Sequence, residues 1–244
     1  MSKTILITGA TSGIGEALAK LAARRDYRVI ACGRNSEKLA HLAAMDNIST
    51  LQFDVTCADE TFQALNSIDC DIAVLNAGTC EYVDTDAIEP EMFHRVFNPN
   101  FFGVVNCVAA LRHNFMRDDQ IVIVDSLARL LPFTRSQAYG ASKAALHYFT
   151  KSLAVDLARE GVLVQSVSPG FVETPLTNKN DFEMPMKISV EEAAEDLLNG
   201  IEKRRSSIYF PTRFSLILRL LNVLPDAIKQ ALCIAMKRQM KRGK

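Results

Sequence analysis

A tyrosine and a lysine in the second half of the chain are spaced so that they could transfer a proton together. Tyr139 and Lys143 lie four residues apart, and in a helix this spacing puts two side chains on one face. A nearby ammonium group favours the phenolate, and therefore lowers a tyrosine pKa from its usual value of ~10. Such a phenol can give a proton to a carbonyl oxygen as a hydride arrives, or take it back in the reverse direction. A Tyr-x-x-x-Lys pair also occurs by chance on helix surfaces, so its meaning depends on the surrounding chain.

A glycine-rich turn near the N-terminus could bind a phosphate. The apolar run Thr4–Thr8 is followed by Gly9-Ala10-Thr11-Ser12-Gly13-Ile14-Gly15 and then by a segment of helical periodicity. Glycine allows the backbone to approach a phosphate closely, and a helix N-terminus offers free N–H groups to the anion. The spacing G-x-x-x-G-x-G differs from the standard dinucleotide fingerprint. A turn of this kind can also serve packing alone, but its place after the first strand favours a cofactor site.

The elements that must position these residues alternate along the chain. Nearly continuous apolar runs are typical of parallel strands that are covered on both faces. Strands are expected at residues 4–8, 29–32, 51–53, 72–75, 121–124, 162–167 and 208–210, and helices at 16–25, 37–44, 101–116, 138–159 and 190–203. Repeated β-α-β units predict an α/β fold with a doubly wound, Rossmann-like parallel sheet. We expect one dinucleotide-binding catalytic domain over residues 1–212 and a helical C-terminal extension over 213–244.

Composition narrows the class of protein. The formal net charge is +0 and 48% of the residues are hydrophobic, which is typical of a soluble globular protein and does not indicate nucleic acid as a partner. The first strand begins too early to leave room for a signal peptide. The six cysteines form no C-x-x-C pair, and the four histidines lack ligand spacing. We therefore expect a cytoplasmic protein without a metal site.

The order of these motifs resembles the short-chain dehydrogenase/reductase family over roughly residues 4–175. The resemblance is carried by the glycine loop and by Asp54, Asn76-Ala77-Gly78, Asn100, Ser126, Tyr139, Lys143 and Pro169-Gly170. It implies that Tyr139 is the proton donor and acceptor beside Lys143, and that the Ser126 hydroxyl binds the substrate oxygen. It also implies that Asn100 holds a water against Lys143. An asparagine at this place could also cap a helix, and the two roles are compatible.

The end of the second strand indicates which nicotinamide cofactor is used. An acidic residue there would bind the ribose diol of NAD and repel a 2′-phosphate. This chain has Gly33 followed by Arg34, and a guanidinium group can bind phosphate through two N–H groups. Arg34 could instead be a solvated charge at a helix start, and Ser12 stands where the family often has a second basic residue. We therefore expect NADP(H). The family resemblance implies that it is bound by Gly9, Thr11, Ser12, Gly13, Ile14, Gly15, Arg34, Asp54, Val55, Asn76, Ala77, Gly78, Tyr139, Lys143, Pro169, Gly170, Val172 and Thr174.

Two departures from the family pattern lie beside the expected catalytic group. Asp125 stands where a second serine is common, and Arg129 stands where a glycine is common. Either could alter the charge of the pocket, but neither removes a catalytic group. The leading hypothesis is an enzyme acting on a lipophilic ketone, aldehyde or secondary alcohol. The alternative is a non-catalytic, NADP-sensing Rossmann module, which predicts the loss of Ser126, Tyr139 or Lys143.

The last thirty-two residues are unusual. From Arg213 to Lys244 there are eight Lys or Arg and one acidic residue, and residues 214–224 are apolar nearly all round. The apolar run is too short for a membrane span. It could form a peripheral membrane contact or an access route for a lipophilic substrate, or it could pack on the domain or on a partner subunit. The helices at 101–116 and 138–159 resemble the dimer-forming pair of the family, which implies a homodimer or homotetramer.

Overall fold

Seven parallel strands form one sheet in the computed structural model, which describes residues 2–179 and 182–242, without the side chains of 179 and 238–242. The strands are β1 (Thr4–Thr8), β2 (Arg28–Gly33), β3 (Ile48–Gln52), β4 (Ile72–Leu75), β5 (Gln120–Val124), β6 (Leu163–Pro169) and β7 (Ser207–Phe210). Their order across the sheet is β3-β2-β1-β4-β5-β6-β7, and every neighbouring pair is parallel. The order reverses between β1 and β4. Ligands bind at such a switch point, outside the carboxyl ends of the strands.

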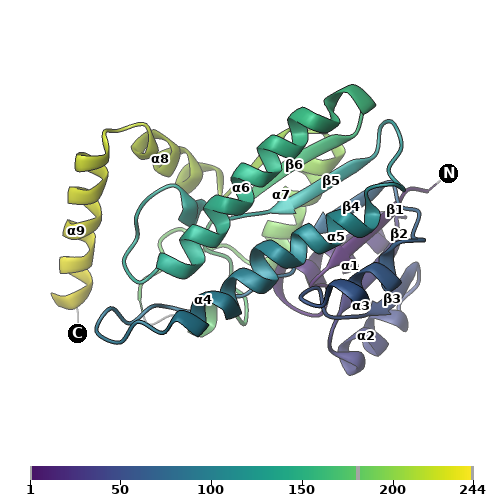
Figure 1. The fold of residues 1–244 in the computed structure, drawn as a ribbon, viewed down its shortest axis with the longest axis horizontal. Coiled ribbons are helices and arrows are strands. Elements are labelled where there is room, and N and C mark those ends of the chain that lie inside the picture. Colours follow the sequence, from purple (N-terminus) through teal and green to yellow (C-terminus); the bar gives the residue numbers. More distant parts are fainter. Residues whose placement is uncertain (1, 180–181, 243–244) are drawn as a thin grey trace.

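Helices cover both faces of the sheet (Figure 1). Ile5 and Ile7 of β1 pack in one core with α1 (Gly13–Arg24) and α7 (Val190–Glu202). Leu6 points the other way, into a core with α3 (Ala58–Leu65), α5 (Gly103–Leu111) and α6 (Gln137–Leu157). This alternation follows from the two-residue period of a strand. The predicted doubly wound α/β fold is therefore confirmed.

The described residues also contain helices that the hydrophobic pattern did not indicate. All seven predicted strands are present, as is α2 (Ser36–Ala43), but α3 and α4 (Pro90–Phe97) were not expected. Each is eight residues long and carries at least one acidic residue in its first turn. Helices of two turns present too few apolar positions for periodicity to stand out. The predicted helix over 101–116 ends at Leu111.

A π-helical turn at Asn98–Phe102 joins α4 to α5 and makes one continuous helical rod. A π turn contains one extra residue compared with an α turn, and such turns are frequent at functional sites. Pro99 contributes to the irregularity because it has no N–H to donate. Asn100 lies inside this turn and is fully buried. The alternative interpretation of Asn100 as a helix cap is therefore wrong.

Two helices follow the sheet. After β7, α8 (Thr212–Asn222) and α9 (Asp226–Arg242) extend along one end of the molecule (Figure 1). Leu218 of α8 and Cys233 of α9 are buried against Leu127, Leu130 and Leu131, which follow β5. One side of the extension thus packs on the domain. The hydrophobic side chains on its other side are exposed, namely Leu216, Ile217, Leu220, Val223, Ile228, Leu232 and Ile234. None of the helices, over the residues described, is long and apolar enough to cross a membrane.

Candidate active site

The glycine turn has the geometry that a phosphate cradle requires. Gly9 has a φ of 68°, a conformation that glycine adopts without steric cost. A Cβ on Gly15 would lie 2.4 Å from the carbonyl oxygen of Gly9, so only glycine allows the helix to approach the turn this closely. Ser12 precedes α1, and its side chain makes no capping hydrogen bond. The first N–H groups of α1 are therefore available to an anion, and the cradle fits a dinucleotide pyrophosphate.

The next strand end supports this turn directly. The Asn76 side chain donates hydrogen bonds to the carbonyl oxygens of Thr8 (3.1 Å) and Gly9 (3.4 Å). In return, the Thr8 hydroxyl accepts the backbone N–H groups of Asn76 (3.0 Å) and Ala77 (3.1 Å). The ends of β1 and β4 are thereby held together at the switch point of the sheet.

A cavity of about 720 Å³ lies on one side of the glycine turn. Arg34 and Asp54 both line it, and they form an ion pair at 3.3 Å. Partial burial raises the pKa of Asp54, but hydrogen bonds from Thr56 and Arg34 outweigh burial, so the net pKa is lowered. The Arg34 side chain is 76% exposed, so its guanidinium can reach a bound group. The other predicted cofactor residues that line this cavity are Gly9, Thr11, Ser12, Val55, Ala77 and Gly78.

A second cavity, of about 180 Å³, continues from the glycine turn toward Tyr139. A Cβ on Gly13 would lie 3.1 Å from a methyl carbon of Thr174, so the loop after β6 closes over the glycine turn. Gly15 and Asn100 are not among the residues that line either of these two cavities. The predicted residues in the wall of this second cavity are Gly9, Ser12, Gly13, Ile14, Asn76, Ala77, Gly78, Ser126, Tyr139, Lys143, Pro169, Gly170, Val172 and Thr174.

The predicted catalytic side chains converge on this second cavity. Tyr139 and Lys143 lie on the first turns of α6, and the Lys143 ammonium is 5.9 Å from the centre of the Tyr139 ring. The Lys143 ammonium donates a hydrogen bond to the Val124 carbonyl oxygen at 2.8 Å. Ser126 follows β5, and its hydroxyl accepts the N–H of Ala128 at 3.1 Å. The Ser126 hydroxyl also lies close enough to the Tyr139 phenol to lower its pKa. The sequence therefore identified side chains that the fold brings together.

Burial changes the proton affinities of this pair. It raises the pKa of Tyr139 well above the usual value, and the neighbouring Cys80 and Asp125 act in the same direction. The expectation of a lowered tyrosine pKa is thus wrong for the protein alone, because loss of hydration outweighs the hydrogen bond with Ser126, which acts in the opposite direction. Burial also lowers the pKa of Lys143 to about 8, although Asp125 and Cys80 partly counteract it. At neutral pH, Tyr139 carries its proton and Lys143 is mainly an ammonium ion.

Asn100 links the π turn to the catalytic helix. Its side-chain oxygen accepts the N–H of Thr79 at 2.7 Å. Its amide group donates to the Thr79 carbonyl (2.9 Å) and to the Ser142 hydroxyl (3.0 Å). A Cβ on Gly78 would lie 2.8 Å from the Asn100 oxygen and 3.5 Å from the Lys143 ammonium nitrogen. Asn100 therefore lies near Lys143 but uses its own polar atoms to position the loop after β4.

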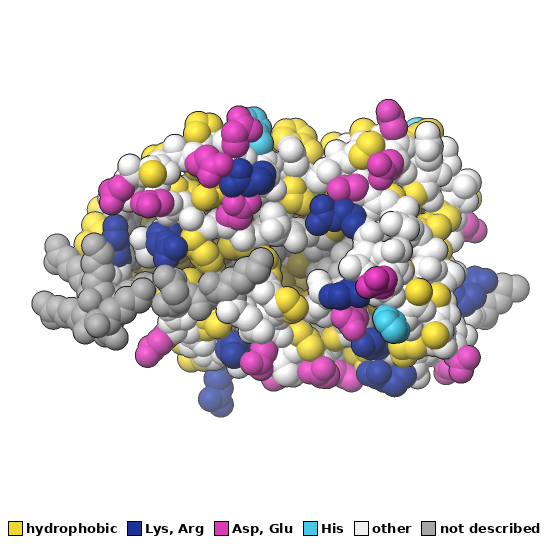
Figure 2. Space-filling view, turned by 90° about the horizontal axis from the view of Figure 1, so that it is seen from below, with side chains coloured by type: hydrophobic (Ala, Val, Ile, Leu, Met, Phe, Trp, Pro, Cys, Tyr) yellow, Lys and Arg dark blue, Asp and Glu magenta, His cyan; other side chains and the backbone are white. Residues whose placement is uncertain are grey.

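A third cavity, of about 210 Å³, adjoins the second one, and Ser126 and Tyr139 line both. Its wall is mainly apolar, and α8 and α9 supply part of it. Sequence reasoning did not identify these wall residues, because they come from loops and helices far apart in the chain. They include Cys80, Tyr82, Phe133, Phe171, Phe182, Phe214, Leu218, Cys233 and Met236. Phe214 of α8 faces the ring of Phe171 at 5.5 Å. Figure 2 shows a hollow near the middle of the face seen from below, with hydrophobic side chains inside it.

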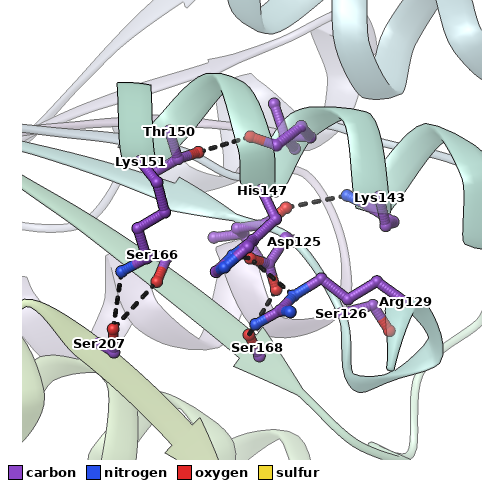
Figure 3. A network of polar contacts seen from close by, with 12 residues as sticks. Asp125, Ser126, Arg129, Lys143, His147, Thr150, Lys151, Ser166, Ser168 and Ser207 are labelled. Carbon is purple, nitrogen blue, oxygen red and sulfur yellow. Dashed lines mark hydrogen bonds and ion pairs between the residues drawn. The ribbon is translucent and has the colours of Figure 1, made fainter. Parts of the chain in front are cut away.

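The two departures from the family pattern lie in direct contact with each other. The Asp125 carboxylate is fully buried and pairs with Nε of Arg129 at 3.3 Å. It also contacts Nδ1 of His147 at 2.7 Å and accepts a short hydrogen bond from the Ser168 hydroxyl (Figure 3). Sequence reasoning did not single out His147 as part of the site. Its position four residues after Lys143, on the same helical face, was the available signal.

Comparisons with known proteins assign the family. The model of the short chain dehydrogenase family matches residues 3–184. A Myxococcus xanthus protein described as an uncharacterized oxidoreductase is 33% identical over 94% of this chain and 95% of its own length. A short chain dehydrogenase structure from Burkholderia cenocepacia, in complex with NADP, has a TM-score of 0.83 at 25% identity, covering 95% of this chain and 97% of that one. A 3-ketoacyl-(acyl-carrier-protein) reductase structure from Brucella melitensis, complexed with NADH, has a TM-score of 0.78 at 25% identity over 85% and 96%.

The chain belongs to the short-chain dehydrogenase/reductase family. It is therefore an oxidoreductase that binds a nicotinamide cofactor and transfers a hydride to or from a small molecule. Because Ser126, Tyr139 and Lys143 are all present and converge on one cavity, the non-catalytic alternative is not favoured.

Proposed function

We propose that this protein is an NADP(H)-dependent oxidoreductase for a lipophilic carbonyl compound or secondary alcohol, with Tyr139 as general acid and base. One observation carries the proposal. Ser126 and Tyr139 stand in the shared wall between the cavity that continues from the glycine turn and the mainly apolar cavity. A carbonyl carbon placed there would face the nicotinamide on one side and hydrophobic side chains on the other.

The side chains have complementary roles in this proposal. The bound nicotinamide supplies or accepts the hydride. The Ser126 hydroxyl donates a hydrogen bond to the substrate oxygen and stabilises its developing charge. Tyr139, which carries its proton at neutral pH, donates that proton to the same oxygen during reduction. The Lys143 ammonium favours the phenolate that results, and Asn100 positions the loop beside it.

The proposed catalytic role has a direct test. Tyr139→Phe removes the proton donor and keeps the ring in its packed position. We expect reduction of aliphatic ketones by NADPH to fall by a factor of about 100 or more, while the dissociation constant of NADPH changes little. Full activity of Tyr139→Phe would refute the role of Tyr139. A parallel loss of NADPH binding would show that the Tyr139 hydroxyl also holds the cofactor.

Arg34 supports the choice of NADP(H). It lines the large cavity beside the glycine turn, and its ion pair with Asp54 is exposed enough to open for a phosphate. Calorimetric titration with NADPH and NADH should show tighter binding of NADPH, and Arg34→Ala should abolish this preference. Arg28, an exposed residue at the opposite end of β2, gives the matched control. Equal binding of NADH and NADPH by the native protein would overturn the choice.

The outer side of α8 and α9 supports a peripheral contact with anionic membranes. Leu216 and Leu220 of α8 and Val223 at its C-terminal end are exposed. The segment from Arg213 onward carries eight basic residues and one acidic residue. Apolar side chains beside basic charge are typical of interfacial helices. Flotation with anionic liposomes should be lost when these three residues are replaced by serine. Equal flotation of both proteins would exclude a contact through α8.

We also propose a cytoplasmic homodimer or homotetramer that assembles through α5 and α6. Tyr148 and Val155 are large hydrophobic side chains on α6 that remain exposed in the single chain. Burial in a subunit interface would remove them from water. Light scattering after size-exclusion chromatography should give a mass of two or four chains. Replacing both residues by glutamate should give the monomer mass.

A further inference from the structure

Asp125 is a buried carboxylate at the end of β5, and the proposed reaction does not use it. Its backbone N–H donates to the Val167 carbonyl at 2.7 Å, which fixes the residue between β5 and β6. Its side chain contacts Arg129, His147 and Ser168 from three different elements (Figure 3). A buried carboxylate is costly unless it is paired. This arrangement therefore needs an explanation beyond packing.

Asp125 pairs with one largely buried cation, Arg129, and lies near a second, Lys143. The Arg129 side chain is 10% exposed and pairs with Asp125, and Arg129 makes no other ion pair among the residues described. Lys143 is also buried, and its ammonium group bonds to the carbonyl of Val124, the residue directly before Asp125. His147, one helical turn after Lys143, touches the Asp125 carboxylate. Asp125, Tyr139 and Lys143 line the same cavity.

We propose that Asp125 is a positioning residue whose buried negative charge, shared with Arg129, keeps Lys143 protonated beside Tyr139. The proposal rests on the proposed function for the use of the Lys143 ammonium in catalysis. The charge relationship itself is a property of the protein without substrate. The two departures from the family pattern are then coupled, because the negative charge of Asp125 offsets the positive charge of Arg129, which stands where the family commonly has a glycine.

The two cations respond differently when the carboxylate is removed. A guanidinium group does not lose its proton in a protein, whereas a buried lysine amine does so readily. Without Asp125, Lys143 would therefore lose the negative charge that partly offsets its burial and would give up its proton at lower pH, while Arg129 would stay charged. Burial already lowers the pKa of Lys143 to about 8, and Asp125 is the largest influence that raises it.

Other groups around Asp125 and Lys143 must be considered in the test. Tyr139, His147 and Lys151 face this region from α6. Arg129 approaches from the turn after β5 and Ser168, which is neutral, from β6. Cys80 lies after β4, and burial raises the pKa of its thiol to about 11, so it is uncharged at neutral pH. Among the residues described, Asp125 is thus the acidic side chain that offsets the positive charges of this cluster.

The decisive experiment titrates the Lys143 amine by NMR in protein labelled with 15N-lysine, its signal assigned by its loss in Lys143→Arg. In Asp125→Asn, which keeps the shape of the side chain, we expect the midpoint to move down by about one pH unit or more. Asp119→Asn is the matched control. It removes the same charge just before β5, about 20 Å away along the strand, and should leave the midpoint unchanged. An unchanged midpoint in Asp125→Asn overturns the proposal.

A second variant protects the test if Asp125→Asn fails to fold. Removing one partner of a buried ion pair is often more disruptive than removing both. Arg129→Gln alone should move the Lys143 midpoint up, because the Asp125 charge is then no longer shared with Arg129. The double variant Asp125→Asn/Arg129→Gln should return the midpoint close to that of the native protein. If Arg129→Gln lowers the midpoint or leaves it in place, the coupling is absent.

The pH dependence of ketone reduction with NADPH gives the functional readout. Loss of the Asp125 charge lowers the proton affinity of both Lys143 and Tyr139. The decline of kcat/KM at high pH should therefore begin at lower pH in Asp125→Asn, and Asp125→Glu should restore it. A role in packing alone would lower kcat/KM at every pH and leave the pH at which the alkaline decline begins unchanged. If the native protein reduces no ketone, the proposed function fails, while the NMR titration still decides the role of Asp125.

Discussion

Thr8 and Asn76 join the ends of β1 and β4 through hydrogen bonds in both directions. The Thr8 hydroxyl accepts the N–H of Asn76 at 3.0 Å, and the Asn76 side chain donates to the Thr8 carbonyl at 3.1 Å. Thr8→Val keeps the shape of the residue but leaves the N–H groups of Asn76 and Ala77 without their acceptor. We expect the free energy of unfolding to fall by about 1–3 kcal/mol, measured by urea denaturation. Thr8→Ser retains the hydroxyl and should lose much less; equal losses would assign the effect to the methyl group.

The buried lysine predicts the alkaline limit of activity. The burial of Lys143 lowers its pKa to about 8, so its ammonium form is present below this pH and is lost as the pH rises through it. We therefore expect kcat/KM for ketone reduction to decline above pH 8. In Lys143→Arg the residual activity should lack this decline, because arginine stays charged. Persistence of the same decline in Lys143→Arg would assign it to another group.

Asn100 has a structural contribution that can be separated from catalysis. Its side chain is fully buried and satisfies both backbone polar groups of Thr79. Asn100→Ala should lower the free energy of unfolding by about 1–3 kcal/mol because these groups lose their partners. Asn98 lies in the same π turn but is exposed, so Asn98→Ala should change stability by less than about 0.5 kcal/mol. Similar losses in both variants would show that the turn, and not the buried amide, is responsible.

The contribution of α8 to the apolar cavity can be measured with substrates of different length. Phe214 lines the cavity and contacts the ring of Phe171. Phe214→Ala should raise KM for long-chain ketones more than for short ones, because it removes apolar surface from the wall. The dissociation constant of NADPH should not change. Leu216, on the exposed side of the same helix, provides the control, and equal effects of Leu216→Ala would contradict the assigned orientation.

The parts of the site that the sequence predicted share a local physical cause. The glycine turn is recognisable because its conformation and close approach exclude other residues, as Gly9 and Gly15 show. Tyr139 and Lys143 are recognisable because the period of one helix places them together. The apolar strands are equally clear, since both of their faces are buried. In each case the information lies within a few neighbouring residues.

The parts that the sequence did not predict depend on contacts between distant segments. Phe171 and Phe214 meet across the apolar cavity, although forty-three positions separate them. Asp125 and Arg129 were noticed as departures, but their pairing with His147 required the packing of α6 on the sheet. The direction of the Tyr139 pKa also depended on burial, which the spacing of two residues does not report.

The π turn at Asn98–Phe102 sets the rotational phase between α4 and α5. Its extra residue allows Asn100 to face Ser142 while Val104 and Val108 of α5 face the core. A π turn completes its rotation with one residue more than an α turn, so deleting one residue here would leave a regular helix in which Asn100 and the apolar positions of α5 could not all keep their places. Either the buried amide or the apolar stripe would then point the wrong way. This segment should therefore tolerate many substitutions but no change in length. In a scan of single-residue deletions, we expect deletions within Asn98–Phe102 to abolish folding.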